Sequence, residues 1–220
     1  MGQRQKRLAE LLLIGGATFV DNHHRRPALT DIRDTFLEPH VMKVYKSLGG
    51  LESLPKVSPG AWDLILDCGV VELDEELHFN RYRLQTLQSP LYDRLHNFPT
   101  SVYSAFSMQF EAACFSSGKF GGKWTNASAE VQFGFADSRP CVHTMMSPRW
   151  KQRAFYDFIN DLTPMVLRFN LSRISVWDSV VFSNMKRSVR DVLMANLSLE
   201  ESQGWGRTLL TLVTSRMAFA

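Results

Sequence analysis

The sequence predicts a mixed α/β fold, and three observations lead to that prediction. An amphipathic helix is expected near the N-terminus, two short apolar strands flank a turn within residues 62–79, and a long amphipathic helix followed by strand candidates begins at residue 147. Helices that alternate with strands are typical of a sheet covered by helices. The 220 residues suffice for one domain with its own buried core.

Composition and charge describe an ordinary soluble globular protein. Hydrophobic residues make up 45% and charged residues 21% of the chain, which excludes a disordered or fibrous protein. The net charge of +3 is compatible with a polyanionic partner but does not indicate a protein that coats nucleic acid. Three cysteines without CxxC spacing indicate neither a disulfide framework nor a zinc site. We expect a cytoplasmic protein, because Glu10 interrupts the first apolar run and no run is long enough to span a membrane.

The first half of the chain predicts two helices and a hairpin. A helix is expected over residues 3–15, with leucines on one face and a Gly-Gly stop. A second is expected over residues 31–48, interrupted near Pro39, before a connector rich in Gly and Pro. The runs "WDLIL" and "VVELD" then flank the turn-favouring residues Asp67-Cys68-Gly69, which predicts a β-hairpin.

The second half predicts one strong helix among weaker elements. Residues 80–89 are expected to be helical, and residues 90–148 are interpreted as an insertion or elaborated subregion of a single domain over 1–220, with a strand candidate at 129–135. Ser147 as cap and Pro148 at the first position predict a helix over 147–162. Strands are expected at 165–170 and 173–178 and a helix at about 179–198, whereas residues 206–220 give no clear pattern.

The hairpin carries more acids than a buried hairpin should. Glu72 and Asp74 fall on one face of their strand because strand side chains alternate. If Leu66 pairs with Gly69, Asp63 lies opposite Glu72, whereas a shift of one residue would turn Asp63 to the other face. Converging carboxylates repel one another unless a cation joins them, and Mg²⁺ prefers such oxygen ligands.

The remaining acids of this segment have a simpler interpretation. Asp67 lies in the turn, and Glu75 and Glu76 follow the second strand, where turn and exposed positions explain them without a metal. We therefore expect them at the surface.

At this point the pattern resembles a known superfamily. The pattern consists of Asp63, eight intervening residues, Glu72-Leu73-Asp74 on a second strand, and His78 four residues later. It resembles the motif of the PD-(D/E)xK, or restriction-endonuclease-like, nucleases, and among them the branch of very-short-patch repair endonucleases. The segment "RWKQRAFYDFINDLTPMVLRFN" is similar to the helix and strand that follow the hairpin in that branch. Glu10 resembles an acidic residue in the helix that precedes the core.

The resemblance implies a fold and an activity. The fold would be a restriction-endonuclease-like core, a mixed central sheet flanked by helices, with an inserted segment and helical extensions. The activity would be Mg²⁺-dependent DNA endonuclease activity, with Mn²⁺ as an alternative metal, in a bacterial or phage restriction, repair or defence system. Asp63, Glu72 and Asp74 would be metal ligands and Glu10 an auxiliary ligand. Asp74 stands where the superfamily has a lysine, so His78 would take over as base.

The same interpretation assigns DNA-binding residues. Arg81 and Arg83 follow the metal strand, and Arg149, Lys151 and Arg153 lie at a helix N-terminus, where anions are favoured. The resemblance implies DNA as a partner, together with either a second copy of the chain in a homodimer or partner proteins of a defence or repair system.

Two alternatives stay open. Glu130 and Gln132 could form a second metal strand, with Lys119 and Lys123 as phosphate donors beside it. The whole protein could also be a catalytically inactive nuclease-fold module that binds nucleic acid or protein.

Overall fold

A mixed three-stranded sheet forms the centre of the molecule. The computed structural model describes residues 2–21, 24–51, 55, 57, 60–117, 124–135 and 147–220. The strands are β1 (Leu64–Leu66), β2 (Gly69–Asp74) and β3 (Leu171–Ser175), in the order β1-β2-β3. β1 is antiparallel to β2, and β3 is parallel to it. The expected mixed α/β class is confirmed.

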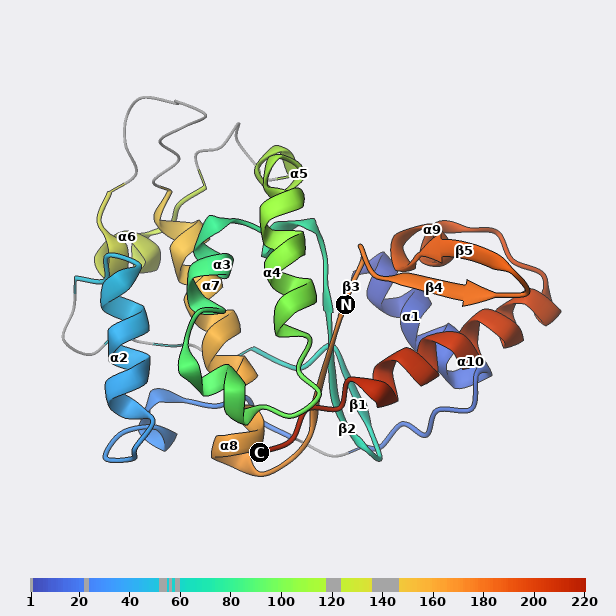
Figure 1. Ribbon diagram of the computed structural model, residues 1–220, viewed down its shortest axis with the longest axis horizontal. Coiled ribbons are helices and arrows are strands. Elements are labelled where there is room, and N and C mark those ends of the chain that lie inside the picture. The colour runs from blue at the N-terminus through green and yellow to red at the C-terminus, as the bar shows by residue number, and fades with distance from the viewer. Residues whose placement is uncertain are drawn as a thin grey trace.

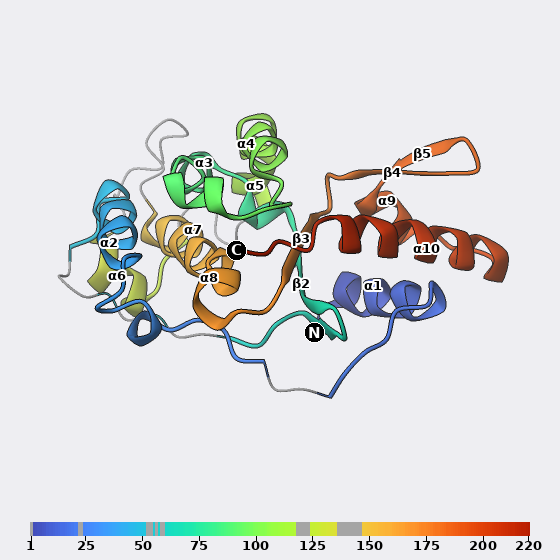
Figure 2. The same cartoon turned by 60° about the horizontal axis from the view of Figure 1, so that its bottom comes forward.

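Helices cover the sheet from two sides (Figures 1 and 2). On one side lie α2 (Glu38–Ser47), α3 (Arg81–Thr86), α4 (Thr100–Gln109), α5 (Glu111–Ser117), α6 (Ala127–Phe133), α7 (Pro148–Asp161) and α8 (Thr163–Leu167). On the other lie α1 (Gln3–Ile14), the hairpin of β4 (Ser179–Phe182) and β5 (Met185–Ser188), α9 (Val189–Met194) and α10 (Leu199–Ser215). Short 3₁₀ helices span Leu29–Asp31, Glu76–His78 and Pro90–Arg94.

Strand β2 divides two hydrophobic cores. Val71 and Leu73 pack into the core shared with α1 and α10, so Glu72 and Asp74 point to the other face, toward α7. The register pairs Leu66 with Gly69, which is the register that places Asp63 opposite Glu72 and one of the two that the sequence left open. Gly69 has φ of 148°, and a Cβ there would come within 2.5 Å of the Asn170 carbonyl oxygen. The hairpin turn therefore needs glycine where it meets the start of β3.

Several predicted helices are present. The helices expected at 3–15 and 147–162 are α1 and α7, with Leu8, Leu11, Phe155 and Phe158 buried as predicted. The helix expected at 31–48 is confined to α2, because Pro39 starts the helix rather than interrupting it. The helix expected at 80–89 is α3, which Asn80 caps by accepting hydrogen bonds from two backbone N–H groups.

Three strand or helix predictions are wrong. The strand candidate 129–135 is helix α6, which begins because the Asn126 side chain accepts a hydrogen bond from the Ala129 N–H. The strand expected at 165–170 is α8, which ends at Arg168 in the left-handed conformation, and the strand itself begins at Leu171. The helix expected at 179–198 starts instead with the β4–β5 hairpin, whose turn residues Ser183 and Asn184 both have positive φ.

The segment without a clear sequence pattern forms the longest helix described, α10. Ser198 and Glu201 make a capping box at its start. Its backbone approaches α1 closely, because a Cβ at Gly206 would lie 2.2 Å from the Leu11 carbonyl oxygen. In the described part of the chain, none of the helices combines the length and apolar character required to cross a membrane.

Candidate functional site

A polar cavity of about 230 Å³ lies between the β1–β2 hairpin, α1 and α7. We call it the acidic cavity. Its ionisable and amide lining comes from segments far apart in the sequence: Gln5, Arg26, Asp63, Glu72, Glu75, His78, Arg149, Arg153, Asp157 and Asn160. Asp63 and Glu72 come from the hairpin, Arg149, Arg153 and Asp157 come from α7, and Arg26 comes from the segment before α2, so the cavity combines groups that bind cations with groups that bind anions.

Hydrogen bonds hold Asp63 and Glu72 side by side. The backbone N–H of Asp63 donates to Glu72 Oε1 over 3.1 Å, and the backbone N–H of Leu73 donates to Asp63 Oδ2 over 2.9 Å. Gln5 Nε2 donates to Asp63 Oδ1 over 2.5 Å. These contacts extend the β1–β2 register by one residue, so the predicted juxtaposition of Asp63 and Glu72 is confirmed.

The charge of Glu72 is incompletely compensated. Burial and the neighbouring Asp63 carboxylate raise the pKa of Glu72 to about 8, and the guanidinium groups of Arg26 and Arg173 offset only part of this. Arg26 Nη2 donates to Glu72 Oε1 over 2.6 Å. A carboxyl group with such a pKa is largely protonated at neutral pH, so a cation bound by the pair would have to displace this proton.

Asp74 does not join this pair. Its Oδ2 accepts a hydrogen bond from the Tyr103 hydroxyl over 2.8 Å, and its Oδ1 accepts one from Arg173 Nη1 over 2.5 Å. The side chain is buried and is absent from the lining of the acidic cavity. The prediction that three hairpin carboxylates converge is therefore wrong for Asp74, because a guanidinium from β3 already compensates its charge.

Arg173 and Arg83 anchor a fully buried ion network beneath the cavity. Arg173 Nε pairs with Asp161 Oδ1, and Arg83 Nη2 donates to Asp161 Oδ2 over 2.7 Å. The Tyr92 hydroxyl donates to the same oxygen over 2.6 Å. Arg83 is 1% exposed, so the prediction that it contacts nucleic acid is wrong. Its ion pair instead compensates a buried carboxylate.

His78 lies between an acid and an arginine. Its Nδ1 is 2.8 Å from Asp157 Oδ2 and its Nε2 is 2.7 Å from Arg153 Nη2. Because a guanidinium can only donate, Nε2 accepts, and the ring proton belongs on Nδ1, where it donates to Asp157. Asp157 thus orients the His78 ring, and Nε2 of His78 faces Arg153.

One triad in the described chain could geometrically hold a metal, but its environment argues against it. Ligand atoms of Asp74, His78 and Asp157 lie within 4.8 Å of one another. Arg173 already compensates the two carboxylates, and the His78 nitrogen that faces them carries the proton. These residues form a charge-balanced network, so Asp63 and Glu72 are the better ligands for a cation.

The other predicted residues are placed as follows. Arg149 and Arg153 line the acidic cavity. Three other predicted residues do not reach the cavity. Arg81 makes a bidentate ion pair with Glu111, and Lys151 is buried against Tyr82. Glu10 pairs with Arg7 on an exposed face of α1. Since Glu130 and Gln132 lie on helix α6, they form no metal strand, and Lys119 and Lys123 lie outside the described residues.

The surface acids of the hairpin segment show a mixed outcome. Asp67 is exposed as expected, and the side chain of Glu75 is 39% exposed, although Glu75 also lines the cavity. The expectation is wrong for Glu76, whose side chain is 12% exposed and lies 2.7 Å from Arg4 in an ion pair. Arg4 and Gln5 together show that the first turns of α1 reach the site, although Glu10 does not.

Sequence reasoning missed four residues of the site and its support: Gln5, Arg26, Asp157 and Arg173. A signal existed for Arg173, because it is a charged residue within a segment that the sequence predicts to be a strand, like Glu72. No comparable signal marks Gln5 or Arg26, since both approach the site only through the tertiary fold.

Comparison with known proteins gives one match. No curated protein and no solved structure matches the chain. The model of a family described as "Family of unknown function (DUF7255)" matches residues 43–195, a range that contains the hairpin, α7 and β3. Because this match spans more than half of the sequence, the chain belongs to the DUF7255 family.

Proposed function

We propose that this protein is a divalent-cation-dependent phosphodiesterase that cleaves DNA, built on a divergent restriction-endonuclease-like core. One observation carries the proposal. Asp63 and Glu72 lie opposite each other across the hairpin, in a cavity that Arg149 and Arg153 also line. The two carboxylates can bind a divalent cation, and the two guanidinium groups can bind a phosphate. Metal-dependent hydrolysis of a phosphodiester needs both kinds of group in one place.

The carboxylates suit Mg²⁺ or Mn²⁺. Repulsion from Asp63 contributes to the raised pKa of Glu72, and a bound cation would remove that repulsion. Mg²⁺ commonly takes one or two carboxylates and fills its other positions with water and phosphate oxygens. Bound there, the cation would acidify a water molecule and polarise the phosphoryl group.

The chain's own residues would orient the phosphate and take the proton. Arg149 and Arg153 would bind the non-bridging phosphate oxygens. When Arg153 turns to the phosphate, it releases Nε2 of His78, which Asp157 keeps oriented. The attacking water forms the new P–O bond, the P–O bond to the leaving strand end breaks, and the freed Nε2 accepts the proton of the water.

The order of elements also supports the resemblance. A hairpin, a helix and a strand parallel to β2 follow one another in the chain. Both strands of the hairpin lie in one sheet with this last strand, β3, which begins after the segment 165–170 where the sequence predicted a strand. The lysine of the superfamily is absent, because Asp74 stands in its place and is bound to Arg173. This absence favours a second candidate, a nuclease-like module that binds nucleic acid or protein without cleaving it.

Plasmid cleavage tests the proposal. Supercoiled plasmid incubated with the protein and Mg²⁺ or Mn²⁺ should be nicked or linearised, and EDTA should stop the reaction. Glu72→Gln and Asp63→Asn should abolish cleavage, whereas Glu10→Gln, on the exposed face of α1, should not. Cleavage that persists in Glu72→Gln, purified in the same way, would refute the site. DNA binding without cleavage by the wild type would favour the module.

A further inference from the structure

A second cavity, of about 710 Å³, has a different lining. It lies beside α8 and the 3₁₀ helix Pro90–Arg94, next to Asn170 at the amino end of β3. Phe36, Phe169 and Phe219 contribute rings to it, and Arg94 and Arg168 contribute guanidinium groups. We call it the aromatic cavity. It shares no lining residue with the acidic cavity.

Two of its phenylalanine rings are unusually open to solvent. The exposed fraction is 57% for Phe36 and 48% for Phe219. The Arg94 guanidinium lies 4.9 Å above the Phe36 ring, which holds the charge at the mouth of the cavity by a cation–π contact. Solvated aromatic rings next to a positive charge suit a ligand that has both a π face and a negative charge.

The two arginines that line this cavity are exposed and have no acidic partner among the described residues. Within the described parts of the chain, no carboxylate pairs with Arg94 or Arg168, whereas Arg83, Arg173 and Arg216 all have acidic partners. Of the side chains that line the cavity, Asp93 alone is acidic, so the side-chain charge is positive. Arg168 also ends α8 with φ of 57°, a position at which glycine is usual. A residue other than glycine in this conformation carries a backbone cost, and Arg168 adds an exposed positive charge to the lining of the cavity.

We propose that the aromatic cavity binds a single-stranded segment of nucleic acid. One base would stack on an exposed phenylalanine ring, and Arg94 and Arg168 would hold neighbouring phosphates. Stacking rings combined with arginines are the means by which single strands are bound without sequence preference. A duplex does not offer free base faces. This inference rests on the proposed function, because it specifies the DNA substrate as one that contains an unpaired segment.

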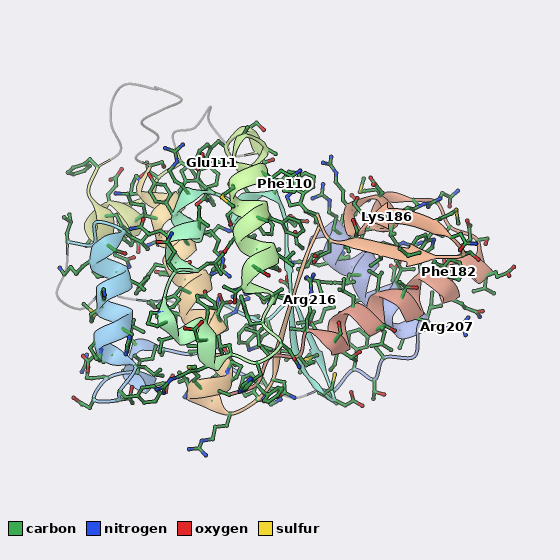
Figure 3. All side chains as sticks on the ribbon, in the orientation of Figure 1. Phe110, Glu111, Phe182, Lys186, Arg207 and Arg216 are labelled. Atoms are coloured by element: carbon green, nitrogen blue, oxygen red, sulfur yellow. The ribbon has the colours of Figure 1, made fainter. Side chains whose placement is uncertain are left out.

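Fluorescence anisotropy in EDTA tests binding without catalysis. The probe is a fluorescein-labelled oligo-dT of about 12 nucleotides, a length that a single-strand site can accommodate. The test variants are Phe36→Ala and the double variant Arg94→Ala with Arg168→Asn, since Asn tolerates the left-handed conformation. Arg207→Ala is the matched control, because Arg207 is exposed on α10 in the other part of the molecule (Figure 3).

The expected results separate stacking from charge. Phe36→Ala should weaken binding about tenfold because one base no longer stacks. The double arginine variant should weaken it at least about tenfold, and the slope of log affinity against log salt should fall by about 0.7 for each phosphate that is no longer neutralised. Arg207→Ala should bind as the wild type does, and a duplex of the same sequence length should bind more weakly than the single strand.

Four results with nucleic acid, and a fifth with a competing peptide, would overturn the inference. The four are no binding of oligo-dT, unchanged binding by the double variant, unchanged binding by Phe36→Ala, or equal affinity for duplex and single strand. An oligoglutamate peptide that displaces the probe as well as unlabelled oligo-dT does would also overturn it, in favour of an acidic protein partner. The proposed function fails separately, through plasmid cleavage that survives in Glu72→Gln while the anisotropy results stand.

Discussion

Replacing Glu72 by Gln tests the charge balance of the acidic cavity. Glu72 is 5% exposed, and its Oε1 accepts hydrogen bonds from Arg26 and from the Asp63 backbone N–H. The amide oxygen of Gln can accept the same two bonds. The variant therefore removes the titrating group and leaves the shape and the acceptor in place.

The effect on stability should depend on pH in a defined direction. The pKa of Glu72 is about 8 in the folded protein and near 4.5 in the unfolded chain, so the folded state binds the proton more tightly. The stability that the protonated group contributes is fully present below pH 4.5 and is lost as pH rises through about 8. At about 1.4 kcal/mol for each pH unit, the full shift corresponds to at most about 5 kcal/mol.

Urea unfolding of both proteins measures this difference. Near pH 4.5 the free energies of unfolding of wild type and Glu72→Gln should agree, whereas near pH 8 the variant should be more stable by several kcal/mol, up to the limit of about 5 kcal/mol. Saturating Mg²⁺ should narrow the gap near pH 8, because a cation bound to the ionised group stabilises the wild type and not the variant. A gap that does not change with pH would refute the assigned charge balance, and a gap that Mg²⁺ leaves unchanged would refute the metal ligand.

Three further predictions concern the ion network, the helix contact and the phosphate contact. Arg83→Met should lower the free energy of unfolding by about 3–5 kcal/mol, because it removes one of the two guanidinium partners of the buried Asp161 carboxylate, whereas Arg81→Met on the same helix should cost less than about 1 kcal/mol; equal losses in urea unfolding would contradict the buried pair. Gly206→Ala should cost about 1–3 kcal/mol and lower the Tm, since its Cβ would meet the Leu11 carbonyl oxygen, and an unchanged Tm would contradict the close approach. Arg153→Ala should reduce plasmid cleavage by about 10²-fold while Mg²⁺ still stabilises the protein, and full activity would exclude a role in phosphate binding.

The local geometry of the hairpin was predictable because several local rules agree. Apolar alternation selects which face of β2 is buried, and the short Asp67-Cys68 turn followed by Gly69 leaves little freedom in register. The long helix α7 was predictable for the same reason, since its starting Pro148 and its apolar period coincide. Where caps, turns and periodicity agree, the structure follows the sequence.

The ion network could not be predicted, because its partners are far apart in the sequence. Asp74 and Arg173 are 99 residues apart and meet only when β3 adds to β2. A buried carboxylate has the same sequence pattern whether a metal ion or a distant guanidinium compensates it. The sequence therefore indicated correctly that the charge of Asp74 needs compensation, but a guanidinium rather than a metal ion provides it.

The misassigned elements have a local cause. Residues 129–135 alternate like a strand, yet Asn126 starts a helix that buries Gln132 against Gln152 of α7. In the segment after residue 178, the Ser183-Asn184 turn produces a hairpin in place of the expected helix. In both places one capping or turn residue, rather than the hydrophobic period, decides the element.

Glu72 and Asp74 share one face of β2 but meet different charge environments, and this difference locates the site. Asp74 faces Arg173 and the Tyr103 hydroxyl, so its charge is satisfied within the protein and an added cation would have to displace a guanidinium. Glu72 also has a guanidinium partner, Arg26, but unlike Asp74 it faces a second carboxylate, Asp63, and lines a cavity, so an added cation would relieve the repulsion between the two acids. A buried acid that its own fold leaves incompletely compensated, beside arginines directed at the same space, is the reason to seek the chemistry of this protein at Glu72 rather than at the more deeply buried triad.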